Sequence, residues 1–468
     1  MPIKFYNTYS RRLEVFEPIA PPKVKIYTCG PTVYSFAHIG NFRAYVFEDL
    51  LQRHLEARGF EVERVMNLTD VDDKTIRGSR EAGVSLSEFT AKFKRSFFED
   101  IESLRLQRAR YFPAATEPEN LAKMIEMIDN LLEQEIAYQA DDRSIYFRIS
   151  KYPDYGKLAH LNLAELRPTG RIQSDEYEKE NLGDFALWKA WDEKDGSVGW
   201  ETPWGKGRPG WHIECSAMAT RLLGPELDIH CGGVDNIFPH HEAEIAQSEC
   251  VNRKKFVRYW LHNAHLLVEG QKMSKSLGNF FTLRDLLDKG FSGRELRYAL
   301  IRVNYRLPLN FTFDGLREAR QSLLRIDEWV RRLHDIARDA SPDLQFPAAQ
   351  SDKFFEALDD DLNISAALAE VFDQIRETNS SIDRNELAAG EAAALLIWWQ
   401  RINQVLQLQE EEEATPENVT TLLKKRADVR ADKNWSLSDA LRAEIESLGW
   451  LVKDTKDGQK LTKKSGKT

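Results

Sequence analysis

The feature that most constrains the fold of this chain is a strand–helix–strand pattern within residues 24–68. Residues 24–27 alternate apolar and polar side chains, as a strand does, and residues 60–68 form a second strand-like run. Between them, apolar residues recur at helical spacing, and Gly59 is a plausible stop: Phe47, Leu50, Leu51 and Leu55. This βαβ pattern predicts two parallel strands joined by a right-handed crossover.

The turn between the first strand and the helix carries several reactive groups. Residues 27–34 read YTCGPTVY and residues 38–41 read HIGN. Cys29 lies at the carboxyl end of the first strand, where ligands bind in parallel sheets. Gly40 lies where the loop enters the helix, and the free N–H groups and positive dipole there attract phosphate. One turn of chain therefore offers a thiol, the imidazole of His38 and a phosphate site.

A second reactive element is a basic loop, residues 272–276 (KMSKS), between Gly270 and Gly278. Its two lysines, Lys272 and Lys275, could close over a triphosphate and neutralise charge as pyrophosphate departs. A solvated basic turn would look the same in isolation. Paired with the histidine–glycine turn upstream, the loop resembles the second of the two nucleotide-binding motifs of class I aminoacyl-tRNA synthetases.

A third element has the character of a metal site. His240 and Glu244 are four residues apart and share one face of a predicted helix. Cys29 and Cys215 could complete a tetrahedral set of two thiolates, an imidazole and a carboxylate. The alternatives stay open, because an isolated cysteine is usually a small buried hydrophobe and a His–Glu pair is usually a hydrogen bond. Two further cysteines are expected to bind no metal: Cys231 and Cys250.

Longer blocks of sequence carry a more specific resemblance, to the cysteinyl-tRNA synthetase family. They cover nearly the whole chain and lie at residues 29–34, 38–41, 67–70, 184–189, 207–218, 238–248, 272–280, 357–363 and 432–449. One departure is Asn41, where the class motif most often has a second histidine. Asparagine can still donate a hydrogen bond to a phosphate oxygen.

This resemblance implies a set of site residues. One zinc ion per chain would be held by Cys29, Cys215, His240 and Glu244, with the substrate thiolate as an added ligand and His241 as the rival of His240. The amino-acid pocket would include Cys29, Thr69, Trp211 and His230. Trp211 could equally be a core residue, and His230 could equally be a satisfied buried histidine. The nucleotide would contact Gly40, Asn41, Asp235 and Lys275, and the catalytic groups would be His38, Lys272 and Lys275.

The resemblance also implies the reaction and its partners. L-Cysteine and ATP, accompanied by Mg²⁺, would give cysteinyl adenylate and pyrophosphate, and the cysteinyl group would pass to the 3′ end of tRNA(Cys). The substrate carboxylate attacks the α-phosphate, so no side chain needs to act as a covalent nucleophile. The protein supplies positioning and charge neutralisation. We expect a monomer.

The expected architecture is α/β, with a Rossmann-type parallel-sheet catalytic domain that is split by an insertion. The catalytic domain would span 1–117 and 206–256, the connective insertion 118–205, and a connecting segment with the lysine loop 257–316. A helical bundle would span 317–409 and a small mixed α/β domain of the anticodon-binding type 410–468. Within these segments, residues 145–204 read as irregular and residues 352–379 read as one helix.

The last segment starts with a basic helix and has a hairpin signal at residues 457–458. Trp435 could stack on a base, although core packing is the more common role of a tryptophan. Several cations are candidate phosphate contacts, with a solvated helix face as the alternative: Lys424, Lys425, Arg426, Arg430 and Lys433.

Composition narrows the classes of function. The net charge is −10, which argues against a general nucleic-acid binder but permits one basic face for a specific RNA. The longest apolar run, residues 392–399, is too short to span a bilayer, and no signal-peptide pattern opens the chain. Four cysteines are few for 468 residues, which favours the cytoplasm and metal binding over disulfides.

Two competing functions share parts of this pattern. A related ligase that joins cysteine to a sugar amine would have the same active-site elements but should lack the terminal domain. A non-catalytic zinc- and tRNA-binding relative would be expected to lose the loop lysines, whereas Lys272 and Lys275 are both present.

Overall fold

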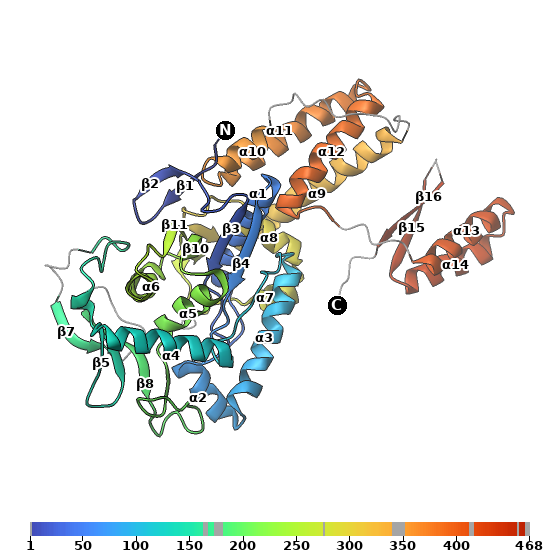
Figure 1. Cartoon of the computed structure of the whole chain (residues 1–468). Helices are drawn as coiled ribbons and strands as arrows, with labels where there is room; N and C mark the ends of the chain where they lie inside the picture. Colours follow the sequence, from blue (N-terminus) through green and yellow to red (C-terminus); the bar gives the residue numbers. More distant parts are fainter. Residues whose placement is uncertain are drawn as a thin grey trace. The chain divides into compact units, whose positions relative to one another are not determined.

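The structure is a computed structural model of the chain. It describes residues 2–161, 167–172, 181–274, 277–338, 352–410, 416–455 and 458–463. The chain divides into two compact units, residues 1–408 and 409–468 (Figure 1).

The larger unit is built on a parallel sheet of four strands in the order β11-β10-β3-β4. The strands are β3 (Lys23–Thr28), β4 (Glu61–Met66), β10 (Leu227–Gly233) and β11 (Val257–Asn263). Helix α1 (Ile39–Ala57) joins β3 to β4. The predicted βαβ unit is therefore confirmed, with its two strands paired in parallel.

Both faces of this sheet are covered because side chains alternate along each strand. On β3, Ile26 belongs to the apolar cluster that includes α1, whereas Tyr27 belongs to the cluster that includes α5. Helices α5 (Trp211–Leu223) and α6 (Glu242–Asn252) cover this second face, and the five-residue turn Ile237–His241 leads into α6 (Figure 1).

The insertion between β4 and β10 is more regular than expected. Its helices are α2 (Asp73–Ala82), α3 (Leu86–Ser103) and α4 (Pro118–Glu133). Its strands are β5 (Ala137–Gln139), β6 (Ile145–Phe147), β7 (Arg167–Ile172), β8 (Asn181–Ala190) and β9 (Gly207–Pro209), which form one sheet. The irregular interpretation of residues 145–204 is wrong. β6 has only three residues, and residues 185–188 of β8 are all buried, so neither strand shows an alternating pattern.

The second half of the larger unit is mostly helical. It contains a three-stranded sheet of β12 (Leu266–Val268), β13 (Gln271–Lys272) and β14 (Leu309–Phe311). Two helices lie between β13 and β14, α7 (Leu283–Asp288) and α8 (Gly293–Ile301), and four follow β14: α9 (Phe313–Ala337), α10 (Lys353–Asp359), α11 (Ile364–Asp383) and α12 (Ala389–Leu406). The single helix expected over 352–379 is wrong. Asp361 and Leu362 have positive φ angles, which end α10 before α11 begins.

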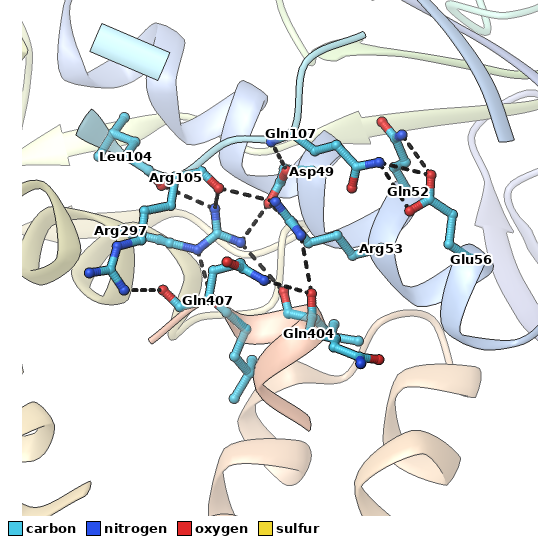
Figure 2. Close-up of polar contacts among 12 residues, drawn as sticks. Asp49, Gln52, Arg53, Glu56, Leu104, Arg105, Gln107, Arg297, Gln404 and Gln407 are labelled. Atoms are coloured by element: carbon cyan, nitrogen blue, oxygen red, sulfur yellow. Dashed lines mark hydrogen bonds and ion pairs between the residues drawn. The ribbon is translucent and has the colours of Figure 1, made fainter. Parts of the chain in front are cut away.

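A buried polar network ties α1 to the end of this bundle (Figure 2). The carboxylate of Asp49 accepts from Arg297 Nη2 at 2.5 Å, from Arg53 Nε at 2.9 Å and from the Gln107 backbone at 2.6 Å. Burial would raise the pKa of Asp49, but the two guanidinium groups hold it below its usual value. Arg297 Nε also donates to the Leu406 carbonyl at 2.7 Å, so the helix that leads out of the active site and the end of α12 share one anchor.

The smaller unit contains α13 (Glu417–Ala431), α14 (Trp435–Ser447), β15 (Trp450–Thr455) and β16 (Gly458–Lys463). The two strands pair antiparallel, which confirms the expected hairpin, although Asp457 itself lies outside the described residues. Val419, Ile445, Trp450 and Val452 form its core. A hairpin at residues 4–15 completes the fold, with β1 (Lys4–Asn7) paired to β2 (Arg12–Val15).

Candidate active site

A cavity of about 460 Å³ opens at the carboxyl ends of the central strands. It brings together residues that are far apart in sequence. Ten of the predicted site residues line it: Cys29, His38, Gly40, Asn41, Thr69, Trp211, Cys215, Asp235, His240 and Lys272. Two others, His230 and Glu244, are fully buried behind this lining, and Lys275 lies outside the described residues.

The start of α1 is fixed by a reciprocal pair of hydrogen bonds. The Asn41 backbone donates to His38 Nδ1 at 3.3 Å, and the His38 backbone donates to Asn41 Oδ1 at 3.2 Å. This is a capping box built from histidine and asparagine. Asn41 therefore has a local structural role that the sequence did not reveal, and this role orients the His38 ring.

Glycine at position 40 is required by its neighbours. A Cβ atom there would lie 2.9 Å from the ring of His38 and 3.1 Å from Met273 Cε. The backbone can therefore approach a ligand closely at the N-terminus of α1, where free N–H groups and the helix dipole favour an anion.

The four predicted metal ligands lie together. One ligand atom from each of Cys29, Cys215, His240 and Glu244 falls within 4.8 Å of the other three. Tetrahedral zinc with bonds of about 2.0–2.3 Å needs ligand atoms about 3.3–3.8 Å apart, so small adjustments would suffice. His240 Nε2 is already 3.1 Å from Glu244 Oε1, and this buried oxygen accepts no hydrogen bond within the described part of the chain. The donor set therefore fits a zinc ion.

A second group overlaps with the first. Cys29, His230, His241 and Glu244 also place ligand atoms within 4.8 Å of one another. His240, however, lines the cavity, whereas His241 does not. His241 Nε2 is 3.2 Å from Cys29 Sγ and its Nδ1 is 2.8 Å from His262 Nε2. This geometry suits His241 to support the Cys29 sulfur from behind.

The pKa shifts of the site residues agree with a role in metal binding. Burial lowers the pKa of His240 to about 3 and that of His241 well below its ordinary value, so both rings are neutral, as metal ligation requires. The pKa of the Cys29 thiol is raised by its hydrogen bond with Cys215 and by burial. In the protein alone the two adjacent thiols resist ionisation, and a divalent cation would favour their thiolate forms.

His230 occupies a supporting position. Its side chain is 0% exposed, its Nε2 lies 3.0 Å from Glu244 Oε2, and its ring stacks on Trp260 with centroids 4.6 Å apart. It does not line the cavity. These contacts match a buried histidine whose hydrogen bonds are satisfied, and a role of His230 in the substrate pocket stays a prediction.

Asp235, the expected ribose contact, lines the cavity two residues after the end of β10. A Cβ atom on Gly233 would come within 2.3 Å of Asp235 Oδ1, so the carboxylate lies against the bare backbone of the β10 end. Gly232 is equally restricted, since a Cβ there would be 2.7 Å from the His241 ring. Glycine at both positions lets the chain turn beneath the site.

The basic loop approaches the start of α1. Lys272 lines the cavity, and Asn279 braces the loop by accepting from the Ser274 backbone at 2.8 Å and donating to the Lys272 carbonyl at 3.2 Å. Further along, the Phe280 ring lies edge-on to His38 at 5.2 Å. The two nucleotide-binding motifs therefore meet, although residues 275–276 are not among those described.

Several functional neighbours were not predicted. His212 contacts His240, with Nδ1 atoms 3.0 Å apart, and Asn67 and Glu214 flank Thr69. All three lie inside the blocks that carried the resemblance, but the contacts of His212 with His240 and of Glu214 with Thr69 join distant elements and leave no periodic signal. Sequence spacing alone could not have paired them.

In the smaller unit, one candidate phosphate contact is wrong. Arg426 is 1% exposed and forms an ion pair with Asp454 at 2.8 Å, so it is a core residue of that unit. Core packing of Trp435 is also wrong, since this residue is 56% exposed, with the Arg430 guanidinium 5.4 Å from its ring centre.

Comparison with protein-family models gives three matches. Residues 15–321 match the class I (C) tRNA synthetase catalytic domain, residues 353–410 the DALR domain, and residues 412–460 the anticodon-binding domain of cysteinyl-tRNA ligase. Among curated proteins, the cysteine–tRNA ligase of Chlamydia muridarum is 52% identical over 99% of this chain and 100% of its own length. The cysteine–tRNA ligase of Protochlamydia amoebophila is 49% identical over 99% of this chain and 98% of its own length.

Solved structures with the same fold are more distant in sequence. Mycobacterium tuberculosis methionyl-tRNA synthetase in complex with methionyl-adenylate superposes with a TM-score of 0.62 at 15% identity, covering 82% of this chain and 92% of that one. The LeuRS–tRNA–LeuAMS complex of Agrobacterium radiobacter gives 0.61 at 12% identity, covering 84% and 85%. These likenesses confirm the expected Rossmann-type fold class.

Proposed function

Because the chain belongs to the cysteinyl-tRNA synthetase family, we propose that the cavity at the ends of β3 and β10 is where cysteine meets ATP. The enzyme is a ligase that activates L-cysteine with ATP and charges tRNA with it. The observation that carries the assignment of the cavity is the group Cys29, Cys215, His240 and Glu244 beneath a rim that holds His38 and Lys272.

Zinc is the metal that this donor set favours. Two thiolates, an imidazole and a carboxylate suit a tetrahedral zinc ion better than the hard cations Mg²⁺ and Ca²⁺. When bound, zinc offers a further coordination position to the substrate sulfur, and it prefers a thiolate to a serine hydroxyl. Cys29, Cys215, His240 and Glu244 hold the ion, with one ion per chain. His241 stays behind Cys29 as a supporting residue.

The nucleotide would occupy the opposite side of the cavity. The backbone N–H groups at Gly40 and the side chains of His38 and Asn41 face the phosphates, and Asp235 faces the ribose. Lys272, together with Lys275 of the same loop, neutralises charge on the departing pyrophosphate. Magnesium would accompany ATP and neutralise part of the negative charge on its phosphate groups. Lys275 enters this proposal from the sequence alone.

These residues act by positioning. They hold the cysteine carboxylate in line with the α-phosphate and stabilise the charge that develops there, so no covalent enzyme intermediate is needed. The cysteinyl group then passes from the adenylate to the 3′ end of tRNA(Cys), and AMP leaves. We assign tRNA recognition to the smaller unit, and we retain the five-segment domain scheme as a proposal.

The cellular setting follows from the same reaction. The monomeric state stays a proposal. Charged tRNA is used by cytoplasmic ribosomes, and the four cysteines are free thiols, which supports a cytoplasmic location. No helix in the described ranges is long and apolar enough to cross a membrane.

The test is ATP–pyrophosphate exchange measured with cysteine and with serine, together with zinc content. Steric exclusion discriminates near-isosteres by only about 10²-fold, whereas decoding needs about 10⁴-fold. We expect the intact enzyme to reach the larger ratio and the zinc-depleted enzyme to lose cysteine-dependent exchange, with recovery on adding zinc. A zinc-free enzyme that keeps the full preference for cysteine would show that the metal is structural.

A further inference from the structure

Three side chains beside the metal group form a hydrogen-bond chain whose directions are fixed. The Gly30 backbone N–H donates to Asn67 Oδ1 at 2.9 Å. Because a backbone N–H can only donate, the Asn67 oxygen must face Gly30 and its NH₂ group must face the other way. That NH₂ group donates to Thr69 Oγ1 at 3.1 Å. The orientation of the amide is therefore determined by its partners.

At its other end, the chain terminates on a carboxylate. Thr69 Oγ1 is 3.0 Å from Glu214 Oε2, and an ionised carboxylate can only accept, so the hydroxyl proton of Thr69 points to Glu214. A hydroxyl has one proton and two lone pairs. The proton is used by Glu214 and one lone pair by Asn67. One lone pair of Thr69 remains, and Thr69 lines the cavity.

The backbone around this chain is rigid. The Thr69 backbone N–H donates to the Pro31 carbonyl at 3.1 Å, and the Thr69 carbonyl accepts from Val33 at 3.0 Å. Gly30 packs so closely on the end of β4 that a Cβ there would lie 1.8 Å from the Asn67 carbonyl oxygen. Thr69 is 2% exposed and Glu214 is 0% exposed. The positions of both side chains are therefore fixed, and turning the hydroxyl proton into the cavity would break its hydrogen bond to Glu214.

We propose that Glu214 is a positioning residue that makes the Thr69 hydroxyl an acceptor for the α-ammonium group of the amino-acid substrate. This inference rests on the proposed function of the cavity. Of the three polar groups of cysteine, the thiolate and the carboxylate are acceptors, and only the ammonium group donates. An acceptor-only hydroxyl thus selects the ammonium group and repels a carboxylate in the same place.

Charge supports the same assignment. As a carboxylate, Glu214 places a negative charge behind the hydroxyl, and hydrogen bonds in series polarise one another in a low-dielectric site. A hydrogen bond to a charged group contributes about 1.5–3 kcal/mol, which corresponds to about 10- to 100-fold in affinity. The ammonium group of the substrate would gain this interaction, whereas an analogue with a hydrogen atom in its place would not.

The experiment compares two ligands of the zinc-loaded enzyme by calorimetry: L-cysteine, and 3-mercaptopropionate, which keeps the thiol and the carboxylate but lacks the ammonium group. Thr69→Val and Glu214→Leu should each weaken cysteine binding about 10- to 100-fold and change the affinity for 3-mercaptopropionate less than threefold. Thr69→Ser keeps the hydroxyl and should restore cysteine binding. In Glu214→Gln the amide oxygen can turn to Thr69, so this variant should lose less affinity for cysteine than Glu214→Leu.

The double variant Thr69→Val/Glu214→Leu provides the decisive arm. If Glu214 acts through Thr69, the second substitution lowers the affinity for cysteine no further than the first. Additive losses, or equal losses for both ligands, would overturn the proposal and leave Glu214 with a structural role only. Glu48→Gln, which alters another fully buried acidic side chain, is the control for general disturbance of the core and should alter neither affinity. If Glu214→Leu fails to fold, the proposal is still tested by Thr69→Val and Glu214→Gln, through their affinities for cysteine and for 3-mercaptopropionate. Wild-type enzyme that binds neither ligand in a zinc-dependent manner would instead refute the proposed function.

Discussion

The indole of Trp211 stacks on the imidazole of His240, with ring centroids 4.1 Å apart and planes inclined by 16°. Nδ1 of the same imidazole lies 3.0 Å from His212 Nδ1. The ring is therefore held by an aromatic face and by a polar contact, and its Nε2 atom is directed at Glu244. Contacts of this kind orient metal ligands and tune their affinity.

The first prediction concerns this stack. Trp211→Leu should weaken zinc binding about 10-fold and raise the KM for cysteine, because loss of a partner that orients a ligand typically costs 10- to 100-fold. Trp211→Phe keeps an aromatic face and should stay within about threefold of wild type. Competition with a zinc chelator measures the affinity. Trp191→Leu, at a 38% exposed indole outside the cavity, is the control; an equal loss there would argue against the stack.

The second prediction separates the two candidate histidine ligands. His240→Ala and Cys215→Ser should release zinc and abolish cysteine-dependent exchange while circular dichroism stays unchanged. His241→Ala should still bind one zinc at saturating metal, with weaker affinity, because it removes contacts to Cys29 and His262 but no expected metal ligand. Metal content after gel filtration decides between them. A metal-free His241 variant beside a fully loaded His240 variant would assign the ligand to His241.

How much of this site could be predicted depended on the range of the contacts involved. The βαβ unit followed from local periodicity, and the metal and nucleotide residues followed from family blocks. The partnership of Glu214 with Thr69 spans 145 residues, and that of His212 with His240 spans 28, so neither leaves a local pattern. The break between α10 and α11 was also missed, because no glycine or proline marks the two positive-φ residues.

The same limits apply to charged residues. Arg426 is surrounded by basic neighbours in sequence, which suggested an exposed phosphate contact, yet it is buried against Asp454. Asp70 is likewise buried, and it pairs with Lys94 at 2.6 Å across 24 residues of sequence. Burial of a charge depends on a partner elsewhere in the chain, which composition does not show.

The third prediction is a pH dependence from Glu48 on α1. Burial raises the pKa of this carboxyl to about 8, although Arg64 and Thr28 oppose the shift. The native state thus keeps a proton that the unfolded state releases above its ordinary value of 4.5. Between these values the unfolded state binds fewer protons, so the free energy of unfolding falls as pH rises. Glu48→Gln should flatten this fall, as urea unfolding at pH 5.5, 7 and 8.5 would measure. Parallel curves for both proteins would contradict it.

The fourth prediction concerns the lysine loop. Lys275→Ala and Lys272→Ala should each slow adenylate formation by roughly 10²-fold or more while leaving cysteine and zinc binding nearly intact, as expected for loss of a charge partner in the transition state. Single-turnover measurements at saturating ATP separate this effect from weaker ATP binding. Lys289→Ala, at an exposed lysine beyond the loop, is the control. Normal pyrophosphate exchange in a loop variant would remove that lysine from the catalytic set.

The last prediction divides the two compact units. A chain ending at Glu410 should keep pyrophosphate exchange, because Leu408 stays fully buried and its backbone N–H still donates to Asn403 at 2.7 Å. The same chain should charge tRNA much less efficiently, because the anticodon-binding module is lost. Exchange and charging are measured on one preparation, so that a folding defect would lower both. Charging that equals that of the intact enzyme would show that residues 411–468 do not contribute to tRNA binding.

A point variant refines this last prediction without removing the unit. Trp435 is exposed, and a base that stacks on it would contribute about 1–3 kcal/mol, so Trp435→Ala should raise the KM for tRNA about 5- to 150-fold with unchanged pyrophosphate exchange. Leu437→Ala, at a 47% exposed apolar residue two positions away, is the matched control for lost apolar surface. Equal effects of the two substitutions would indicate a general apolar contact, whereas an effect confined to Trp435 indicates stacking on RNA.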